Sequence, residues 1–527
     1  MLTYQIRLPI NTRHLFTDIH STSKLTIVST ALRRLFLLSR GLSTSVSPMN
    51  SSKPNVVVVG GSYVGSRIVD LLAPRVYKTH NVIMIEKSSH FQNQFVFPRI
   101  HAVKGFEHKA FIPFTETFFR NADLLREELG LPQDGELPSA STSVKQGVVQ
   151  SIHPKYVSLE SGEQVPYEFL VIATGTGQPG TMKVSGKQDN IERWHEIQRN
   201  VEKAEKIVVV GAGAYGIQLV TDLKTYKPTA SKDVTLVHSR QHVMNRFHPK
   251  LHEIVMERLN ELGIDVVLGK RVVVPEAGFP NDQGKRFNVD LVRNPNVPLE
   301  DGKEDKDVQL EADLVVLCTS ATPSSSPLRT LVPEAIHPDT GYIRVKPTMQ
   351  IDTSRLPTAV NGHIPKADPS FLSHIFAIGD VADTGAHKAA RPGYFQADVA
   401  ARNIAKMIAH KGKLERVDDP GVEKKVREEL ESLTLHEKEP LYDSGLQEEL
   451  KEELELEQYT FDPPGIHLSL GLDSGLIFRN PRQPAPENPN PEATWSWDAD
   501  RGHTQDLEVN TKRLWDTRAW RVKDWTA

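Results

Sequence analysis

Two glycine-rich turns, each placed directly after an all-apolar run, constrain the fold of this chain more than any other feature of its sequence. The first turn is residues 60–65 (GGSYVG), after the run 56–59, and the second is residues 211–216 (GAGAYG), after the run 207–210. A strand that ends at such a turn and continues as a helix points free backbone N–H groups and the positive end of the helix dipole at one spot, where a pyrophosphate fits. Two such turns predict an α/β chain with two dinucleotide-binding sites.

The spacing of the glycines matches the roles that a dinucleotide-binding turn requires. The first glycine permits the tight turn, the second lets the pyrophosphate approach the backbone, and the third lets helix and strand pack closely. The first turn carries Ser62 in the middle place, which narrows the approach but can still donate through its N–H and hydroxyl. The glycines expected to form the two dinucleotide sites are Gly60, Gly61, Gly65, Gly211, Gly213 and Gly216.

The strands that follow the two turns end differently. The strand after the first turn ends in Glu86, an acid that can accept hydrogen bonds from an adenosine ribose. The strand after the second turn ends in His238, Ser239 and Arg240, with no acid. Basic and hydroxyl groups at this place suit the 2′-phosphate of NADP, so we expect NADPH, with NADH also possible as a substrate. The alternative is a surface loop that discriminates neither.

The order of elements after the first turn is repeated after the second, and this repeat predicts the domain organisation. We expect two Rossmann-like domains, the second inserted in the first, plus a C-terminal extension. The predicted segments are 1–50 (targeting presequence or disordered), 51–190 (FAD-binding domain, first part), 191–335 (NAD(P)H-binding domain), 336–410 (FAD-binding domain, second part), 411–458 (acidic helical or disordered insert) and 459–527 (C-terminal segment with a Trp-rich tail).

Composition excludes several classes of protein. The chain has a single cysteine, Cys318, so it has neither an internal disulfide nor a CxxC redox pair. Cys318 follows the apolar run 314–317 and is interpreted as a small core residue. The net charge of −4 at pH 7 argues against specific nucleic-acid binding. No spacing of His residues predicts a metal site.

The first 50 residues have the composition of a mitochondrial transit peptide. They are rich in Ser, Thr and Arg, and Asp18 is their only acid. The alternative is a disordered extension or a gene-model artefact. Initiation at Met49 would give a cytosolic form without this segment. No apolar run is long enough to span a bilayer.

The C-terminal region holds two unusual segments. Residues 411–457 are dense in Glu and Lys, which is typical of a solvated helix or a disordered insert. The final stretch carries five of the six tryptophans, and such a tail docks on the body, on a partner or at a lipid interface. We favour docking on the body and keep peripheral membrane contact as an alternative. The tail residues are Trp495, Trp497, Trp515, Trp520 and Trp525.

Taken together, the motifs resemble those of the apoptosis-inducing-factor-like flavoproteins, in the mitochondrion-associated and ferroptosis-suppressor branch of the FAD-dependent pyridine nucleotide-disulfide oxidoreductases. The resemblance covers about residues 55–410. It is carried by VVVVGGSYVG (56–65), IEK (85–87), VIATGTG (171–177), IVVVGAGAYGIQL (207–219), VTLVHSR (234–240) and IFAIGDVADTGAHKAARPG (375–393).

The resemblance implies roles for individual residues. The first turn would hold the FAD pyrophosphate and the second turn NAD(P)H. Further FAD contacts are implied for Glu86, Lys87, Val149, Ala173, Gly379 and Asp380. Lys388 would lie beside the flavin ring, where a cation stabilises developing negative charge. Arg99 could also approach the flavin.

One residue departs from the family pattern. Gln218 stands where the family commonly has a Glu, two residues after the last glycine of the second turn. The resemblance places this position beside the nicotinamide and the flavin. A Gln can bind a carboxamide but cannot form an ion pair with a lysine, so any mechanism that needs that carboxylate is in doubt here.

The resemblance implies a reaction in which hydride passes from NAD(P)H to N5 of FAD and electrons then go to an acceptor, with a quinone implied as that acceptor. Because Cys318 is solitary, no redox disulfide can carry the electrons onward. Two other classes stay open: a monooxygenase, for which no substrate domain is evident, and a flavin-based redox sensor or death-effector protein with slow turnover.

Overall fold

The computed structural model of the protein describes residues 53–114, 126, 130–135, 141–177, 186–298, 308–319, 321–354, 372–417, 454–484, 488, 490–498, 511–519, 522 and 524–525. The predicted presequence, most of the predicted acidic insert and Trp520 lie outside these residues. Lys53–Ile408 and Glu455–Ala527 together form one compact unit, which contains both glycine turns.

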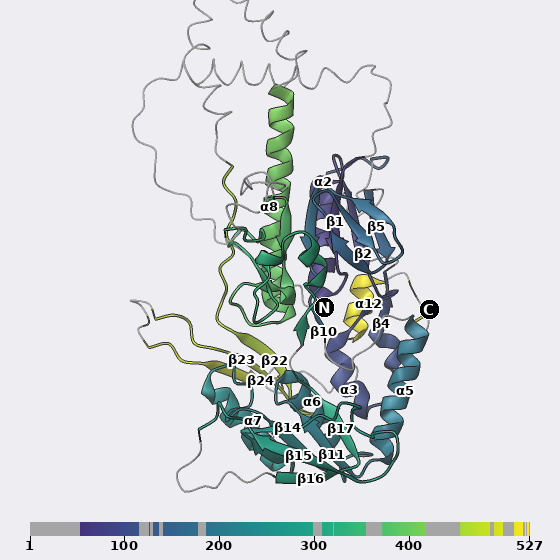
Figure 1. The fold of residues 1–527 in the computed structure, drawn as a ribbon, viewed down its shortest axis with the longest axis vertical. Coiled ribbons are helices and arrows are strands. Elements are labelled where there is room, and N and C mark those ends of the chain that lie inside the picture. The colour runs from purple at the N-terminus through teal and green to yellow at the C-terminus, as the bar shows by residue number, and fades with distance from the viewer. Residues whose placement is uncertain are drawn as a thin grey trace, which may run out of the picture. The chain divides into compact units, whose positions relative to one another are not determined.

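The first glycine turn follows the carboxyl end of β1, the central strand of a five-stranded parallel sheet. The strand order is β20-β9-β1-β2-β5 (Figure 1). Its strands are β20 (Ile375–Ala377), β9 (Phe169–Ile172), β1 (Asn55–Val59), β2 (Asn81–Glu86) and β5 (Thr142–Gln146). The central strands are almost continuously apolar, as expected for parallel strands that are covered on both faces.

The two faces of this sheet are buried by different elements. Val56 and Val58 point to the face covered by helices α2 (Tyr63–Val76) and α8 (Ala390–Val417). Val57 and Val59 point to the other face, which packs on a small antiparallel sheet. That sheet consists of β6 (Val149–Ile152), β7 (Tyr156–Leu159) and β8 (Gln164–Pro166).

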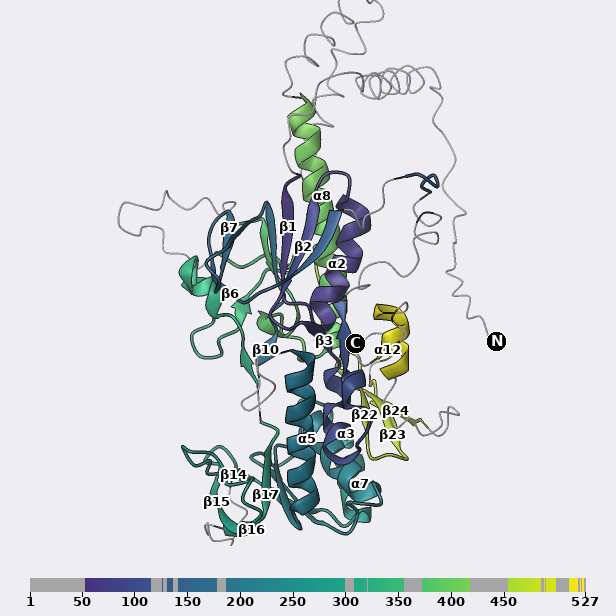
Figure 2. The ribbon, with the colours of Figure 1, turned by 90° about the vertical axis from the view of Figure 1, so that its right-hand side faces the viewer.

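The second glycine turn follows the carboxyl end of β11, an inner strand of a four-stranded parallel sheet that is built in the same way. Its order is β13-β12-β11-β17. One face is covered by helices and the other by a three-stranded antiparallel sheet (Figure 2). The elements are β11 (Lys206–Val210), α6 (Ala214–Thr225), β12 (Asp233–His238), α7 (Pro249–Glu261), β13 (Asp265–Leu268), β14 (Lys270–Val272), β15 (Phe287–Arg293), β16 (Val308–Ala312) and β17 (Leu314–Leu317).

The connectivity confirms the predicted fold class of two Rossmann-like units with the second inserted in the first. Strands β9 and β20 are neighbours in the first sheet, yet the whole second sheet lies between them in the sequence. The chain passes between the sheets through β10 (Thr176–Gly177) and β18 (Thr322–Pro323), which pair antiparallel. The individual boundary residues of the domains stay predictions.

A helical segment connects the first sheet to the second. Helix α3 (Phe97–Ala102) packs against α5 (Lys187–Lys203) and against α6 of the second unit. The elements around it are β3 (His90–Gln92), η1 (Gln94–Val96), η2 (Glu107–Ala110) and β4 (Phe111–Pro113). The shorter elements later in the chain are η5 (Ser326–Thr330), η6 (Pro333–Ala335), β19 (Ile343–Arg344), η7 (Gly379–Val381) and β21 (Ala382–Asp383).

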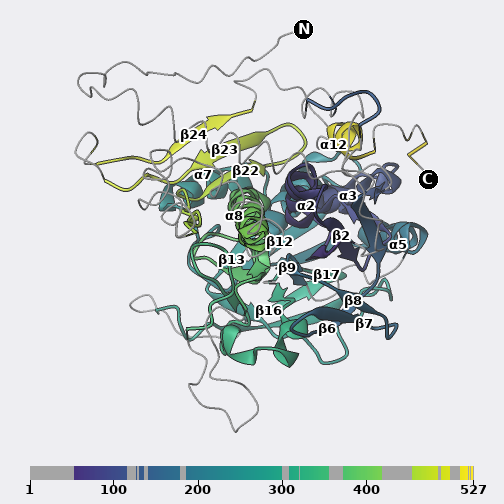
Figure 3. The ribbon, with the colours of Figure 1, turned by 90° about the horizontal axis from the view of Figure 1, so that it is seen from above.

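The C-terminal extension docks on both units. An antiparallel sheet of β22 (Gly465–Ser469), β23 (Gly475–Arg479) and β24 (Thr494–Trp497) lies beside α7 (Figure 3). Helix α12 (Thr511–Arg518) packs beside β4, and the Trp515 Nε1–H donates to the Lys109 carbonyl at 2.8 Å. Trp515 is 1% exposed and stacks on Trp525 at 5.3 Å. For these tryptophans, docking on the body is confirmed.

Two helices are longer than the sequence indicated. Helix α2 begins at Tyr63, inside the first glycine turn, and not after that turn. Helix α8 begins at Ala390 and continues to Val417, past the predicted boundary at 410. Both begin where their first turns are packed against other elements, which local sequence does not reveal.

Candidate dinucleotide sites and the surface between them

The first glycine turn is packed so closely that its outer positions accept only glycine. Gly60 has a φ of +103°, and a Cβ built on it would lie 2.4 Å from the carbonyl oxygen of Ala173. A Cβ on Gly65 would lie 1.8 Å from the carbonyl oxygen of Gly60. The Gly60 N–H donates to Ile85 O at 2.8 Å, which holds the turn against the end of β2. This places the N-terminus of α2 at the strand ends, as a pyrophosphate site requires.

Glu86 is joined to the turn itself. One carboxylate oxygen accepts the Gly61 N–H at 2.5 Å, and the other accepts the Ser88 N–H at 2.9 Å. A Cβ on Gly61 would lie 2.8 Å from the Met84 side chain and 3.0 Å from Glu86 Cβ, so the absence of a side chain here makes room for the acid. Each oxygen keeps a further lone pair for a ribose hydroxyl. The Lys87 side chain next to it is exposed.

The second turn repeats this packing. Gly211 has a φ of +114°, and its Cβ would lie 2.3 Å from the carbonyl oxygen of Cys318. A Cβ on Gly216 would lie 1.9 Å from Gly211 O and 3.4 Å from the Cys318 Cβ. Cys318 therefore occupies the place that Ala173 has in the first unit, where a small side chain is needed. Burial raises the pKa of the Cys318 thiol to about 12, so it stays a neutral thiol.

His238 takes the place of Glu86 in the second turn. The Ala212 N–H donates to His238 Nδ1 at 3.2 Å, just as the Gly61 N–H donates to Glu86. Burial lowers the pKa of His238, and the nearby Arg240 lowers it further, while the backbone of His242 opposes both. With Nδ1 as acceptor, the proton of the neutral ring is on Nε2, which is buried without a hydrogen bond. The turn is thus held by a neutral group.

The two residues after His238 lie at the same strand end. The Ser239 carbonyl accepts from Asn294 Nδ2 at 2.5 Å, and the Arg240 carbonyl accepts from the Gly269 N–H at 3.1 Å. These bonds hold the backbone of Ser239 and Arg240 in place and do not use their side chains. The Arg240 side chain is exposed.

The middle position explains why one turn can carry a serine. Gly213 is the N-cap of α6, with φ −84° and no atom within 4 Å of a built Cβ. Ser62 is the N-cap of α2 with a similar φ of −74°, and its side chain makes no capping bond. Nothing in the protein therefore demands glycine at either place. Only the approach of a ligand would do so, which makes Ser62 compatible with the first site.

The segment that follows β20, an edge strand of the first sheet, packs against the first turn. Gly379 has a φ of +73°, and its N–H donates to Gln396 Oε1 at 2.7 Å. A Cβ on Gly393, in α8, would lie 2.4 Å from Val64 Cγ2. The starts of α2 and α8 therefore meet at a crossing where a glycine is required. This brings residues 379–380 next to the first turn, as the resemblance implied.

Lys388 lies in the same segment and is held by its surroundings. Its Nζ donates to the Ala382 carbonyl and lies 4.3 Å from the centre of the Tyr342 ring. Burial lowers the pKa of Lys388, whereas Asp380 and Asp383 raise it. Burial raises the pKa of Asp380, and Lys388 and Arg246 lower it. Asp380 and Lys388 are therefore close enough for each to shift the pKa of the other.

Val149, Arg99 and Gln218 are three further residues that the resemblance singled out. Val149 is 7% exposed at a bulge of β6. Arg99, for which we predicted an approach to the flavin, instead donates from Nε to Asp222 Oδ2 of α6 at 2.7 Å and is 3% exposed. Gln218 lies in the second turn of α6, one turn before Asp222. Its amide makes no hydrogen bond of normal geometry with Asp222, yet it is close enough to lower the pKa of that carboxyl.

A small pocket lies at His387, the residue before Lys388. His387, Arg391 and Phe395 line one side, and Tyr459, Asp462 and Arg479 come from the C-terminal extension. His387 Nε2 is buried without a hydrogen bond, and burial lowers the pKa of this ring. The ring of Phe247, from the second unit, lies 5.7 Å from the His387 ring. The pocket was not predicted, because its walls come from segments more than 60 residues apart.

The residues present fit two dinucleotides. Both turns have the backbone cradle and the close strand that such a ligand needs, and the first also has a strand-end acceptor, Glu86, for a ribose. The first site would be formed by residues 60–65, Glu86 and Asp380, and the second by residues 211–216 and 238–240. The fold and these sites define an α/β oxidoreductase with one site for a flavin dinucleotide and one for a nicotinamide dinucleotide.

The chain belongs to the pyridine nucleotide-disulphide oxidoreductase family, which matches residues 54–403. It is accordingly an FAD-dependent oxidoreductase with NAD(P)H as co-substrate. FAD supplies the chemistry of accepting a hydride and releasing electrons, while the protein supplies binding, orientation and electrostatics. Among the described residues, no helix is long and apolar enough to cross a membrane.

Named relatives agree with this placement. Fe-regulated protein 8 of Mycosarcoma maydis is 29% identical over 456 residues, which are 82% of this chain and 91% of that protein. Ferroptosis suppressor protein 1 of Homo sapiens is 27% identical over 68% of this chain and 82% of its own length. The fold is similar to that of sulfide:quinone oxidoreductase from Aquifex aeolicus, with a TM-score of 0.55 at 14% identity over 88% of this chain and 92% of that one. The resemblance to the apoptosis-inducing-factor-like branch is thus confirmed.

Proposed function

We propose that this chain oxidises NADPH in preference to NADH and passes the electrons from FAD to a quinone-type acceptor. The nucleotide preference rests on one difference between two turns that are otherwise packed alike. The strand-end position that Glu86 occupies in the first turn is occupied by His238 in the second. A carboxylate at the second strand end would repel the 2′-phosphate of NADPH. A neutral imidazole followed by the exposed Arg240 does not, and the guanidinium attracts a phosphate.

The segment around Lys388 is where we propose that the acceptor approaches, because the resemblance implies that this segment flanks the flavin. The small pocket that His387, Phe395 and Tyr459 line in this segment has a volume of about 20 Å³, which holds little more than one water molecule. Asp462 lines it together with Arg391 and Arg479, so its charge is mixed. A flat acceptor ring would therefore bind beside this segment and not inside the pocket. The sulfide:quinone oxidoreductase of Aquifex aeolicus is named for a quinone, but that protein supports the proposal by its fold only.

Steady-state assays with the purified holoprotein test both parts. We expect NADPH oxidation with a soluble ubiquinone analogue, kcat/KM at least tenfold higher than with NADH, and little hydrogen peroxide. A long-wavelength charge-transfer band with negligible turnover across a panel of acceptors would instead identify a redox sensor. Consumption of oxygen in step with NADPH would support a monooxygenase.

We also propose peripheral contact with a membrane at the mouth of this pocket. Phe395 and Phe461 are 43% and 54% exposed, and Phe461 borders Gly385 next to the pocket segment. Large apolar side chains at such a mouth would insert between headgroups. Flotation with liposomes tests this: wild-type protein should rise with the vesicles and a Phe395→Ser, Phe461→Ser variant should not. Equal flotation of the two would refute it.

We propose a mitochondrial location on the basis of the Ser-, Thr- and Arg-rich first 50 residues. A fluorescent fusion to the full chain should co-localise with mitochondria, and a fusion that starts at Met49 should be cytosolic. The same distribution for both fusions would contradict the proposal.

A further inference from the structure

The first glycine turn is tied to the segment that precedes α3. Tyr63, the first residue of α2, donates its hydroxyl hydrogen to Asn93 Oδ1 at 2.7 Å, and both residues are buried. The Tyr63 ring makes an edge contact with Phe91 at 4.9 Å. Asn93 also donates to Thr511 of the C-terminal helix α12 at 3.3 Å. The start of the first dinucleotide helix is therefore fixed to a position only four residues before α3.

The other end of this segment is tied to the helix of the second glycine turn. Arg99 of α3 and Asp222 of α6 form an ion pair at 2.7 Å with side-chain exposures of 3% and 0%. Two residues further along α3, the His101 ring makes an edge contact with Tyr215 of the second glycine turn at 6.0 Å. Helix α3 thus contacts α6 both at the start of α6 and two turns later.

The hairpin of β22 and β23, residues 465–479, also contacts both Arg99 and α6. Arg99 Nη2 donates to Ser469 Oγ at 3.0 Å and to the Gly471 carbonyl at 3.3 Å. The Leu472 N–H donates to Thr225 Oγ1, at the end of α6, at 2.9 Å. Gly471 has a φ of +117°, and a Cβ there would lie 2.7 Å from the Thr225 side chain. Three segments far apart in the sequence therefore meet at one guanidinium.

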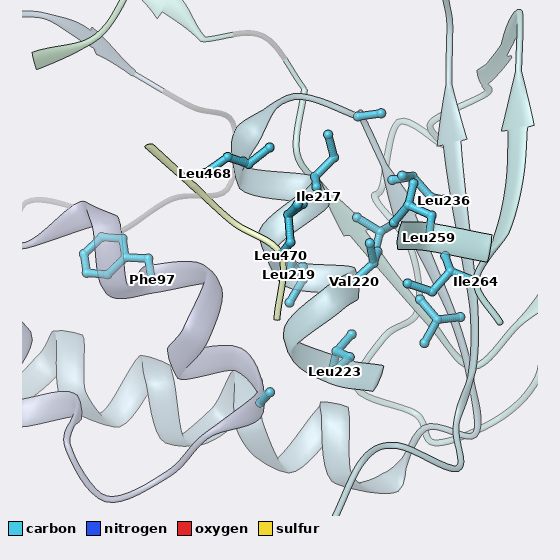
Figure 4. Close-up of a cluster of buried hydrophobic side chains, with 14 of the residues drawn as sticks. Phe97, Ile217, Leu219, Val220, Leu223, Leu236, Leu259, Ile264, Leu468 and Leu470 are labelled. Atoms are coloured by element: carbon cyan, nitrogen blue, oxygen red, sulfur yellow. The ribbon is translucent and has the colours of Figure 1, made fainter. Parts of the chain in front are cut away.

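Apolar side chains surround the ion pair and keep water out. Figure 4 shows Phe97 of α3 and Leu468 and Leu470 of the hairpin around α6, and all three belong to the same buried cluster. Burial raises the pKa of Asp222 to about 6, while Arg99 and Gln218 lower it. A buried ion pair is a costly way to join two helices, because apolar side chains of similar size stabilise as well or better. What the pair provides is one defined geometry, through directional, charge-assisted hydrogen bonds.

We propose that Tyr63–Asn93 and Arg99–Asp222, joined by residues 93–99, form a positioning strut that sets the second glycine turn against the first. The strut would fix where the nicotinamide end of one dinucleotide lies relative to the flavin of the other. Hydride transfer depends steeply on such placement, since misplacement by about 1 Å can cost about a hundredfold in rate. Arg99 and Asp222 are positioning residues that touch neither dinucleotide. The inference uses only the NAD(P)H-to-FAD reaction and depends neither on the acceptor nor on the preference for NADPH.

Two sets of variants separate positioning from folding. Single changes such as Asp222→Leu leave an unpaired buried charge and can unfold the protein. The double variant Arg99→Met, Asp222→Leu removes both charges and keeps the apolar volume. We expect it to fold, to retain FAD and to melt near the wild-type temperature. Its rate constant for flavin reduction by NADPH in rapid mixing should fall at least tenfold, whereas the Kd for NADPH should change less than threefold and dithionite should reduce the flavin as in the wild type.

A structural readout makes the test independent of activity. Spin labels at Glu160→Cys in the first unit and Asn288→Cys in the second, both exposed, with Cys318→Ala, should give one narrow distance distribution in the otherwise wild-type protein. The double variant should broaden it. The matched control is Lys206→Ala, Glu311→Ala, which removes an ion pair of 3.0 Å inside the second unit and should change neither readout. Flavin reduction at the wild-type rate, or an unchanged distance distribution, in the Arg99→Met, Asp222→Leu protein would overturn the proposal.

Discussion

The two glycine turns of this chain are packed almost alike and differ in the group that holds them. In each, the first glycine has a positive φ and lies beneath the carbonyl of the residue that follows a neighbouring strand, β9 or β17, and the third glycine packs on the first. In each, the residue after the first glycine donates its N–H to a side chain at the end of the next strand. The matched residues are Gly60 with Gly211, Gly65 with Gly216, Ala173 with Cys318 and Glu86 with His238.

The difference shows where selectivity resides in such a fold. The backbone cradle is common to both sites because its geometry is dictated by strand–turn–helix packing. The strand-end group carries a negative charge in one site and none in the other, since burial and Arg240 keep His238 neutral. The same position therefore holds the turn in both sites while setting the charge that the ligand meets.

The largest effect should come from filling the cradle. Gly65→Ala and Gly216→Ala each place a Cβ less than 2 Å from a carbonyl oxygen, at 1.8 and 1.9 Å. Overpacking of this kind costs ~3 kcal/mol or more. We expect Gly65→Ala to abolish FAD retention, and Gly216→Ala to keep FAD but lose reduction by NADPH. Absorbance at 450 nm and rapid mixing measure the two. Loss of FAD from both variants to the same extent would contradict the assignment of FAD to the first turn and NADPH to the second.

The next largest effect should come from reversing the charge at the second strand end. Arg240→Asp should raise KM for NADPH ~30-fold, equivalent to about 2 kcal/mol, because a carboxylate would then face the 2′-phosphate. KM for NADH should change less than threefold. The control is Lys285→Asp, at an exposed position of the same unit. Equal effects on the two nucleotides would remove Arg240 from the phosphate site.

A smaller effect should follow from exchanging the middle residues. Gly213→Ser should leave the melting temperature unchanged, since nothing lies within 4 Å of a built Cβ, but should raise KM for NADPH about fivefold, roughly 1 kcal/mol, by crowding the pyrophosphate. Ser62→Gly should alter stability by only a few tenths of a kcal/mol, about the usual cost of glycine at an N-cap. A large loss of FAD from Ser62→Gly would show that the hydroxyl is a ligand.

The smallest effect should be a dependence of stability on pH that arises in the second turn. The folded-state pKa of His238 is below its usual value near 6.5, so between the two values the unfolded chain binds more protons. The stabilising contribution is present above pH 6.5 and is lost as pH falls. Thermal unfolding of wild type and His238→Gln between pH 8 and pH 5 measures it. The variant should show a flatter profile, and identical profiles would contradict the role of His238.

Much of the fold and of both sites could be predicted because the controlling residues are close in sequence. The strands, the turns and the strand-end groups follow from apolar runs and glycine spacing within about 30 residues. Predictions failed where a side chain's partner lies far along the chain. The resemblance implied that Arg99 could approach the flavin, but its partners are Asp222 and Ser469, which are 123 and 370 residues away.

The sequence by itself determined that the chain has two dinucleotide turns, that their strand ends carry different charges and that the solitary Cys318 allows no redox disulfide. These properties depend on local backbone geometry and residue chemistry. Only the tertiary structure decided that Cys318 is the counterpart of Ala173, that the Trp515 tail docks beside β4 and that Arg99 joins the two units. The physical reason is that burial, and with it the choice of partner for a charge or a ring, depends on which distant segments exclude water together.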